Sequence, residues 1–246
     1  MTVRIVTDSA CDLTEEEASA LDIDVVPLFI RFGEVEYIDG KELSVPDFYK
    51  EMSTNEHLPQ TAAPAPGSFG EIFTKRLNAG AESIVCINLS SELSATMESA
   101  QAGAQESGGD VRIVDSCSVS AGQGAIVLAA AHAAKNGASV DEIVSLVSDL
   151  SLRTRVYGAL DTLENLKKGG RVGNAAALFG SVLSIKPLID ISSGVVEEAG
   201  KQRTMKKALA WLAETVKEHG DNLESLAIAH AMAPDIDLFA EELQAV

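Results

Sequence analysis

Short polar side chains cluster directly after an apolar, strand-like segment near the start of the chain. Residues 3–7 read VRIVT, and Asp8, Ser9 and Asp12 follow them. An aspartate after a first strand could accept a phosphoryl group or bind a metal ion. Short polar side chains in this place also cap the next helix and shape its turn. Both interpretations stay open, and the first would make the protein a phosphoryl-transfer enzyme or phosphatase that uses Asp8.

A second polar cluster follows the strand-like residues 111–115. Asp115 and Ser116 come first, Ser118 and Ser120 follow, and the next helix opens near a Gly-Gln-Gly triplet at residues 122–124. A single GxG is weak evidence for phosphate binding. Close packing of a helix on a sheet explains the two glycines equally well.

The third cluster, LSSELSAT at residues 89–96, is the most informative. It follows the apolar run IVCINL and precedes a helical stretch, so hydroxyls and unpaired backbone N–H groups gather near a helix start. Such a place suits an anion, because both the donors and the helix dipole favour negative charge. The alternative is that the serines only cap the helix.

No nucleophile and general base can be paired from the sequence, which predicts no catalytic residue, no metal site and no cofactor. Neither the histidines nor the cysteines have a hydrolase, zinc or disulfide spacing. These residues are His57, His132, His219 and His230, and Cys11, Cys86 and Cys117.

Composition restricts the partners. The formal charge of −18, from 19 basic and 37 acidic residues, repels nucleic acid and anionic lipid surfaces. No run approaches the roughly 20 apolar residues of a membrane span, and the chain starts on a strand-like run without a signal-peptide pattern. We expect a cytoplasmic protein that does not bind nucleic acid and has no stable membrane insertion.

The elements that must position these clusters form an α/β fold. Strands are predicted at residues 3–7, 24–30, 83–89 and 111–115, with helices between them that begin at capping boxes, Thr14 with Glu17 and Ser139 with Glu142. This alternation predicts an N-terminal, parallel-sheet, Rossmann-like domain over residues 1–156. Residues 59–70, rich in proline and alanine, are predicted to be an ordered loop.

A second domain is predicted over residues 157–246. It should contain a strand from residue 157, a short helix ending at Lys168, a hairpin around residues 192–194, a helix at 204–219 and a strand, LAIAH, at 226–230. A hairpin joined to helices favours a mixed sheet in a C-terminal α/β domain.

Taken together, these segments resemble the DegV family over nearly the whole chain. The matching stretches, in order, are VTDSACDL, TAAPAPG, LSSELSAT, VDSCSVSAGQG, TLENLKKGGRVG, IKPLIDISSG, KQRTMKKAL and AIAHA. The resemblance implies a two-domain α/β carrier, not an enzyme. It would enclose one long-chain fatty acid between its domains, with the carboxylate on hydroxyls and the acyl chain in an apolar tunnel.

The resemblance also assigns roles to individual residues. Thr61 and Ser91 match the family's carboxylate contacts, with Ser90 and Ser94 as neighbours of Ser91. Relatives that serve fatty acid kinases in bacterial phospholipid metabolism present the bound acid to a separate ATP-dependent subunit. By that likeness Arg171 and Arg203 belong to a kinase-docking surface.

The basic residues have a plainer alternative. Without the resemblance, they form either a docking face for a partner, as in a sensor or scaffold, or an ordinary solvated surface. They are Lys167, Lys168, Arg171, Lys201, Arg203, Lys206 and Lys207.

Two departures from the family pattern affect the expected site. Ala62 and Ala63 replace the family's serine and glutamine, which removes a hydroxyl and an amide. Family members usually continue beyond residue 246 through a glycine-rich closing segment with a histidine near the headgroup. Its lack here implies an open pocket, a truncated chain or weaker binding.

Overall fold

The computed structural model describes residues 2–178, 185–234 and 236–244. The chain divides into two compact units, Met1–Thr154 and Arg155–Val246, here called unit 1 and unit 2. The fold class predicted from the sequence, an α/β protein with an N-terminal parallel sheet, is confirmed.

Unit 1 is built on a four-stranded parallel sheet in the order β2-β1-β6-β7. Its strands are β1 (Val3–Asp8), β2 (Asp24–Val26), β6 (Ser83–Asn88) and β7 (Asp110–Asp115). The helices of unit 1 are α1 (Glu15–Ala20), α2 (Val45–Thr54), α3 (Pro66–Asn78), α4 (Thr96–Ser107), α5 (Ala121–Lys135) and α6 (Val140–Arg153).

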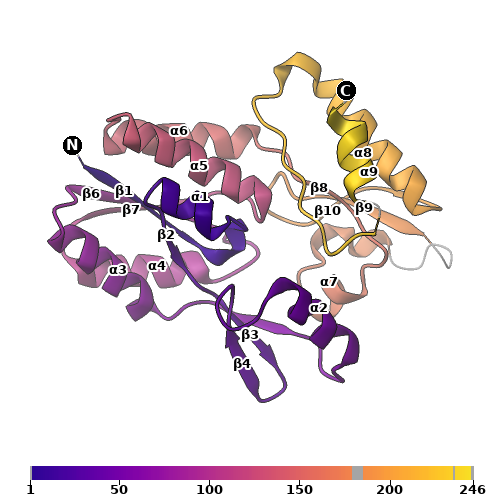
Figure 1. The fold of residues 1–246 in the computed structure, drawn as a ribbon, viewed down its shortest axis with the longest axis horizontal. Helices are drawn as coiled ribbons and strands as arrows, with labels where there is room; N and C mark the ends of the chain where they lie inside the picture. The colour runs from indigo at the N-terminus through magenta and orange to yellow at the C-terminus, as the bar shows by residue number, and fades with distance from the viewer. Residues whose placement is uncertain (1, 179–184, 235, 245–246) are drawn as a thin grey trace. The chain divides into compact units, whose positions relative to one another are not determined.

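Helices cover both faces of this sheet (Figure 1). Val3 and Ile5 of β1 share a buried cluster with α5 and α6, whereas Val6 shares another with Phe69 and Phe73 of α3. Because successive side chains of a strand point to opposite faces, this division places α5 and α6 on one face and α3 and α4 on the other.

Both predicted capping boxes are confirmed. The side chains of Thr14 and Ser139 accept the N–H groups of Glu17 and Glu142, whose carboxylates reach back to the capping residues. The acidic first turns of α1 and α6 also complement the helix dipole, so these two starts are fixed by local sequence.

The prediction of one strand over residues 24–30 is wrong, because the segment breaks at Pro27. Proline has no N–H to continue the ladder, so β2 ends at Val26 and β3 (Phe29–Phe32) enters a second sheet. This sheet is antiparallel, in the order β4-β3-β5, with β4 (Val35–Ile38) and β5 (Gln60–Ala62). The predicted loop at residues 59–70 therefore contains a strand and the start of α3.

Unit 2 contains a three-stranded sheet in the order β10-β9-β8. Its elements are β8 (Tyr157–Ala159), α7 (Glu164–Lys168), β9 (Lys186–Asp190), β10 (Glu197–Gln202), α8 (Met205–His219) and α9 (Ile236–Gln244). Trp211 of α8 packs edge-on against Tyr157, and α9 packs on α8 through Phe239 and Leu243.

Two expectations for unit 2 are wrong. All described pairings of its sheet are antiparallel rather than mixed, and residues 226–230 form no strand. Leu226 and Ile228 keep 47% and 37% of their surface exposed. An apolar alternating pattern specifies a strand only where a partner edge pairs with it, and the described residues provide none here.

Candidate functional site

The serine-rich segment forms a loop beyond the carboxyl end of β6. The N–H of Ser90 donates to the carbonyl of Ser118 at 2.8 Å, and the N–H groups of Leu93 and Ser94 donate back to the carbonyl of Ser90. Ser90 is buried, Ser94 is half-buried, and Ser91 is exposed. The structure therefore brings three of the predicted contact residues into one loop and opens Ser91 most to solvent.

The hydroxyls of Ser90 and Ser94 take part in the local turns. Ser90 Oγ accepts the N–H of Glu92 at 3.2 Å, while Ser94 Oγ lies 2.8 Å from Thr96 Oγ1 and accepts the N–H of Thr96 at 3.3 Å. The residue that caps α4 is Ala95, which offers no side-chain oxygen. The serines thus shape the loop and meet one donor of the helix start, without a regular cap.

Ser91 bonds to the carboxylate at the end of the neighbouring strand. Its hydroxyl donates to Asp115 Oδ2 at 2.6 Å, and its N–H donates to the same oxygen at 3.2 Å. The other oxygen, Asp115 Oδ1, accepts the N–H of Cys117 at 2.7 Å. One carboxylate therefore connects the loop after β6 with the loop after β7.

Asp8 plays a comparable part on the other side of β6. The strand order reverses between β1 and β6, which is where open α/β sheets usually bind ligands. Here the Asp8 carboxylate fills that place. One oxygen accepts Asn88 Nδ2 and the N–H of Leu89 at 3.0 Å each, and the other accepts Gln123 Nε2 and the N–H of Ala10 at 3.1 Å each.

This environment bears on the two interpretations of Asp8. The side chain is fully buried, and burial raises its pKa above the usual value although the four hydrogen bonds lower it. Its bond to Ala10 caps the 3₁₀ turn Ser9–Cys11, so the capping interpretation is confirmed. A phosphoryl donor would have to displace this network to reach Asp8.

Of the two glycines near the start of α5, Gly124 is needed for close packing. A Cβ atom at Gly124 would lie 2.6 Å from the carbonyl oxygen of Cys11. A side chain there would push α5 away from the 3₁₀ turn Ser9–Cys11, which supports the packing interpretation of the triplet. Ser118 Oγ and Gln123 Oε1, both buried beside this region, have no hydrogen-bond partner among the residues that the structure describes.

Thr61 lies in the second sheet rather than in the serine loop. It is exposed on β5 and pairs with Ile30 of β3, which also pairs with Tyr37 of β4, so these three side chains share one face. Ile30 lines a cavity of about 360 Å³ whose other walls are mostly apolar. The other lining residues are Asp39, Gly40, Leu43, Ser44, Val45, Phe48 and Tyr49.

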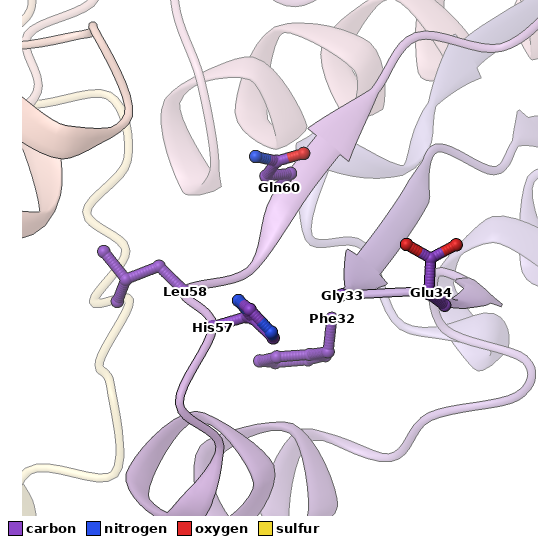
Figure 2. Close-up of a pocket in the computed structure, with 6 residues that line it drawn as sticks. All are labelled: Phe32, Gly33, Glu34, His57, Leu58 and Gln60. Atoms are coloured by element: carbon purple, nitrogen blue, oxygen red, sulfur yellow. The ribbon is translucent and has the colours of Figure 1, made fainter.

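A second hollow of about 370 Å³ lies by the turn between β3 and β4. Figure 2 shows His57 beside Phe32, with the carboxylate of Glu34 directed away from the imidazole. Gly33 has φ +59°, and a Cβ there would lie 3.1 Å from the His57 ring, so glycine permits both the turn and this contact. In the described part of the chain, no group of three metal-ligating side chains gathers here or elsewhere.

The proposed docking residues lie in unit 2. Arg171 is exposed, and its Nη1 donates to the carbonyl of Gly169 at 2.7 Å. Its loop is tied to the start of β10, because the N–H of Asn174 donates to the carbonyl of Val196 at 2.9 Å. Arg203, also exposed, follows the end of β10. Both arginines present charge to solvent from segments that flank the same strand.

Sequence reasoning missed the long-range partners in unit 1. Asp115 was recognised as a polar residue at a strand end, but not as the partner of Ser91, and Asn88 was not singled out. The sequence signal was the tetrapeptide VRIV, which occurs at residues 3–6 and again at residues 111–114. Each copy is followed within two residues by an aspartate, at the end of β1 and of β7. None of the described helices combines the length and apolarity needed to cross a bilayer.

The chain matches known proteins over most of its length. A family model described as "Uncharacterised protein, DegV family" matches residues 2–245. A DegV domain-containing protein of Deinococcus radiodurans is 38% identical over 219 residues, covering 89% of this chain and 78% of the relative. One from Streptomyces coelicolor is 36% identical over 234 residues, covering 95% and 83%.

Solved structures give the same result for the fold. A DegV family protein of Thermus thermophilus, described by its fatty acid binding, has a TM-score of 0.84 at 31% identity and covers 90% of this chain and 79% of its own. DegV of Bacillus subtilis, described as a fatty acid binding protein, has a TM-score of 0.82 at 32% sequence identity, with the same coverage of the two chains. A fatty acid binding DegV family protein of Streptococcus agalactiae has a TM-score of 0.89 at 26% sequence identity, and the match covers 100% of this chain and 88% of its own.

Proposed function

Since this chain belongs to the DegV family, we propose that it binds one long-chain fatty acid and performs no chemistry on it. The headgroup contacts are the hydroxyls of Thr61, Ser91, Ser94 and Ser90. The observation that carries the proposal is the loop beyond β6, which exposes Ser91 at the carboxyl edge of the sheet, in a fold whose relatives are described as fatty acid binding.

Neutral hydroxyls fit such a ligand. A buried arginine would have its own desolvation cost, whereas a hydroxyl can contact a carboxyl group, as donor or as acceptor, without adding a buried cation. Most of the affinity must then come from the acyl chain, at about 0.8 kcal/mol per buried CH₂ group. Saturated chains of about 14 to 18 carbons are therefore credible ligands on this scale.

Mass spectrometry of gently purified protein tests the proposal first, because a bound fatty acid should co-purify. Binding of palmitate or oleate by calorimetry tests the residues. Ser91→Ala and Thr61→Val should each weaken binding between about twofold and 150-fold, the range for one lost hydrogen bond to a neutral or a charged partner.

Ser148→Ala is the matched control, because this exposed hydroxyl on α6 bonds to the carbonyl of Val144 within its own helix. Its affinity should equal that of the wild type. A protein that purifies empty and binds neither acid would overturn the proposal. Equal losses in Ser148→Ala and Ser91→Ala would remove Ser91 from the site.

The proposed cellular role is a cytoplasmic carrier that presents the acid to a separate ATP-dependent fatty acid kinase subunit. Arg171 and Arg203 are the proposed docking residues, since both are exposed cations on an acidic chain. Arg171→Glu and Arg203→Glu should slow acyl phosphate formation by such a kinase while palmitate affinity stays unchanged.

Arg112→Glu serves as the control for charge reversal, because Arg112 is an exposed arginine in unit 1 that pairs with Asp110. Kinase-dependent turnover should be normal in this variant. If Arg171→Glu and Arg203→Glu also turn over normally, neither residue docks a kinase.

A further inference from the structure

The hydroxyl of Ser91 has a single proton to donate, and in the structure it donates that proton in a hydrogen bond to Asp115. The 2.6 Å distance between Ser91 Oγ and Asp115 Oδ2 is that of a charge-assisted hydrogen bond, in which an ionised carboxylate can only accept. The backbone N–H of Ser91 donates to the same oxygen. Both donors of Ser91 are therefore occupied, and its side chain offers a ligand only lone pairs.

An ionised headgroup would meet this site unfavourably. To donate to it, Ser91 would first have to break a charged hydrogen bond, and the ligand would then lie beside the negative charge of Asp115. Two negative charges at such short range repel each other, and protonation of the ligand's headgroup removes this repulsion. The overall charge of −18 acts in the same direction.

Among the described residues of unit 1, the groups that hydrogen-bond to Asp115 carry no positive charge. Among the described residues, the donors to the Asp115 carboxylate are the hydroxyl of Ser91, the N–H groups of Ser91 and Cys117, and the thiol of Cys117, all of them neutral. Burial, together with Asp115 and then Glu92, raises the pKa of Cys117, as expected in a negative field.

On the packed helix α6, Ser151 bonds to the carbonyl of Asp115, and Arg153 is paired with Asp149. On β6, the side chain next to Asp115 is the neutral amide of Asn88.

We infer that the protein binds its fatty acid as the neutral acid, and that Asp115 is the positioning residue that imposes this. The inference rests on the proposed function. The ligand's carboxyl proton, taken from water on binding, is donated to Ser91 Oγ or to Asp115, while Asp115 holds the Ser91 proton away from the ligand. The site then selects a headgroup that can donate a hydrogen bond.

Carbon-13 NMR of carboxyl-labelled palmitate on the full-length protein tests this directly, because the carboxyl shift reports ionisation. Bound palmitate should show the shift of the protonated acid at pH 7, and its affinity should tighten by about tenfold per pH unit as the pH falls, which corresponds to one proton per ligand. Hexadecanol, which can donate, should bind, whereas methyl palmitate, which cannot, should bind at least tenfold more weakly than palmitic acid at equal pH.

The Asp115→Asn variant distinguishes the effect of Asp115 on the headgroup from the effect of the protein's overall negative charge. The amide can donate to an ionised headgroup, so bound palmitate should now show the shift of the carboxylate at pH 7, and the pH dependence should flatten. Glu92→Gln removes a nearby exposed acid, whereas the Ser91 hydroxyl bonds to Asp115, so this variant should behave as the wild type.

The outcomes are distinguishable. Bound palmitate that is ionised at pH 7 in the wild-type protein refutes the inference while leaving fatty acid binding intact. Unchanged behaviour of a folded Asp115→Asn refutes the role of Asp115. Absence of any bound signal refutes the proposed function itself. The measurement on the wild-type protein can refute the inference by itself, even if the Asp115→Asn variant does not fold.

Discussion

Replacing Asp8 by asparagine distinguishes a buried structural carboxylate from a catalytic one. The two oxygens of Asp8 accept four hydrogen bonds, two each, from Ala10, Asn88, Leu89 and Gln123. Asparagine has the same shape but replaces one oxygen by NH₂. Whichever way the amide turns, two of the four donors then face another donor.

The expected loss of stability follows from the number of donors left without an acceptor. Each buried donor left without an acceptor costs about 1–3 kcal/mol, so two of them cost about 2–6 kcal/mol. Removing a buried charge offsets part of this loss. We expect Asp8→Asn to lower the free energy of unfolding by about 2 kcal/mol or more at pH 7.

The pH dependence has a defined sign. Burial raises the pKa of Asp8 in the folded state, so the stability that this group contributes is present at low pH and is lost as the pH rises through its folded-state pKa. Asparagine does not titrate. The difference in unfolding free energy between wild type and Asp8→Asn should therefore grow as the pH falls from 7.

Urea unfolding followed by far-ultraviolet circular dichroism measures these differences. Asp110→Asn is the control, because Asp110 lies at the exposed amino end of β7 in a surface ion pair with Arg112, and it should cost no more than about 1 kcal/mol. An Asp8→Asn protein as stable as the wild type would refute the reasoning. Loss of a metal-dependent phosphatase activity in that stable variant would establish the catalytic alternative.

Three further outcomes are expected. Gly103→Ala should destabilise the protein by about 1–3 kcal/mol in urea unfolding, because its Cβ would lie 2.5 Å from the carbonyl of Pro66, whereas Gly67→Ala, with open space around it, should be neutral or slightly stabilising. Iodoacetamide should modify the partly exposed Cys117 in the native protein well before Cys11, whose burial raises its pKa to about 12, as peptide mass mapping would show; equal rates would contradict this. Ser139→Ala should lower the urea midpoint by an amount equivalent to about 1 kcal/mol, and an unchanged midpoint would deny the capping box its role.

The elements that the sequence predicted correctly depend on local chemistry. Three strands of the parallel sheet, β1, β6 and β7, are short runs rich in apolar residues, and α1 and α6 begin where a hydroxyl and a glutamate lie three residues apart. The failures are elements that depend on distant partners. Residues 60–62 form a strand only because β3 lies alongside, and residues 226–230 form none although their pattern favours one.

The candidate site divides in the same way. Local sequence identified the serine loop and the polar residues at the strand ends, yet it could not show that Asp115 holds Ser91 or that Gln123 reaches Asp8 from 115 residues away. Both contacts depend on the strand order, which places β1 and β7 on either side of β6.

The repeated VRIV was the one clue to this arrangement. Each copy leads to an aspartate at the end of its strand, Asp8 on β1 and Asp115 on β7, and the two carboxylates accept the N–H groups of Leu89 and Ser91 in the same loop. They differ in burial, since Asp8 is sealed inside and Asp115 is half-buried beside the exposed Ser91. A buried carboxylate can fix the loop but meets no ligand, whereas the one at the surface also controls which donors the loop presents. In the proposed mode of binding, the protonation state of the fatty acid therefore depends on Asp115 and not on Asp8.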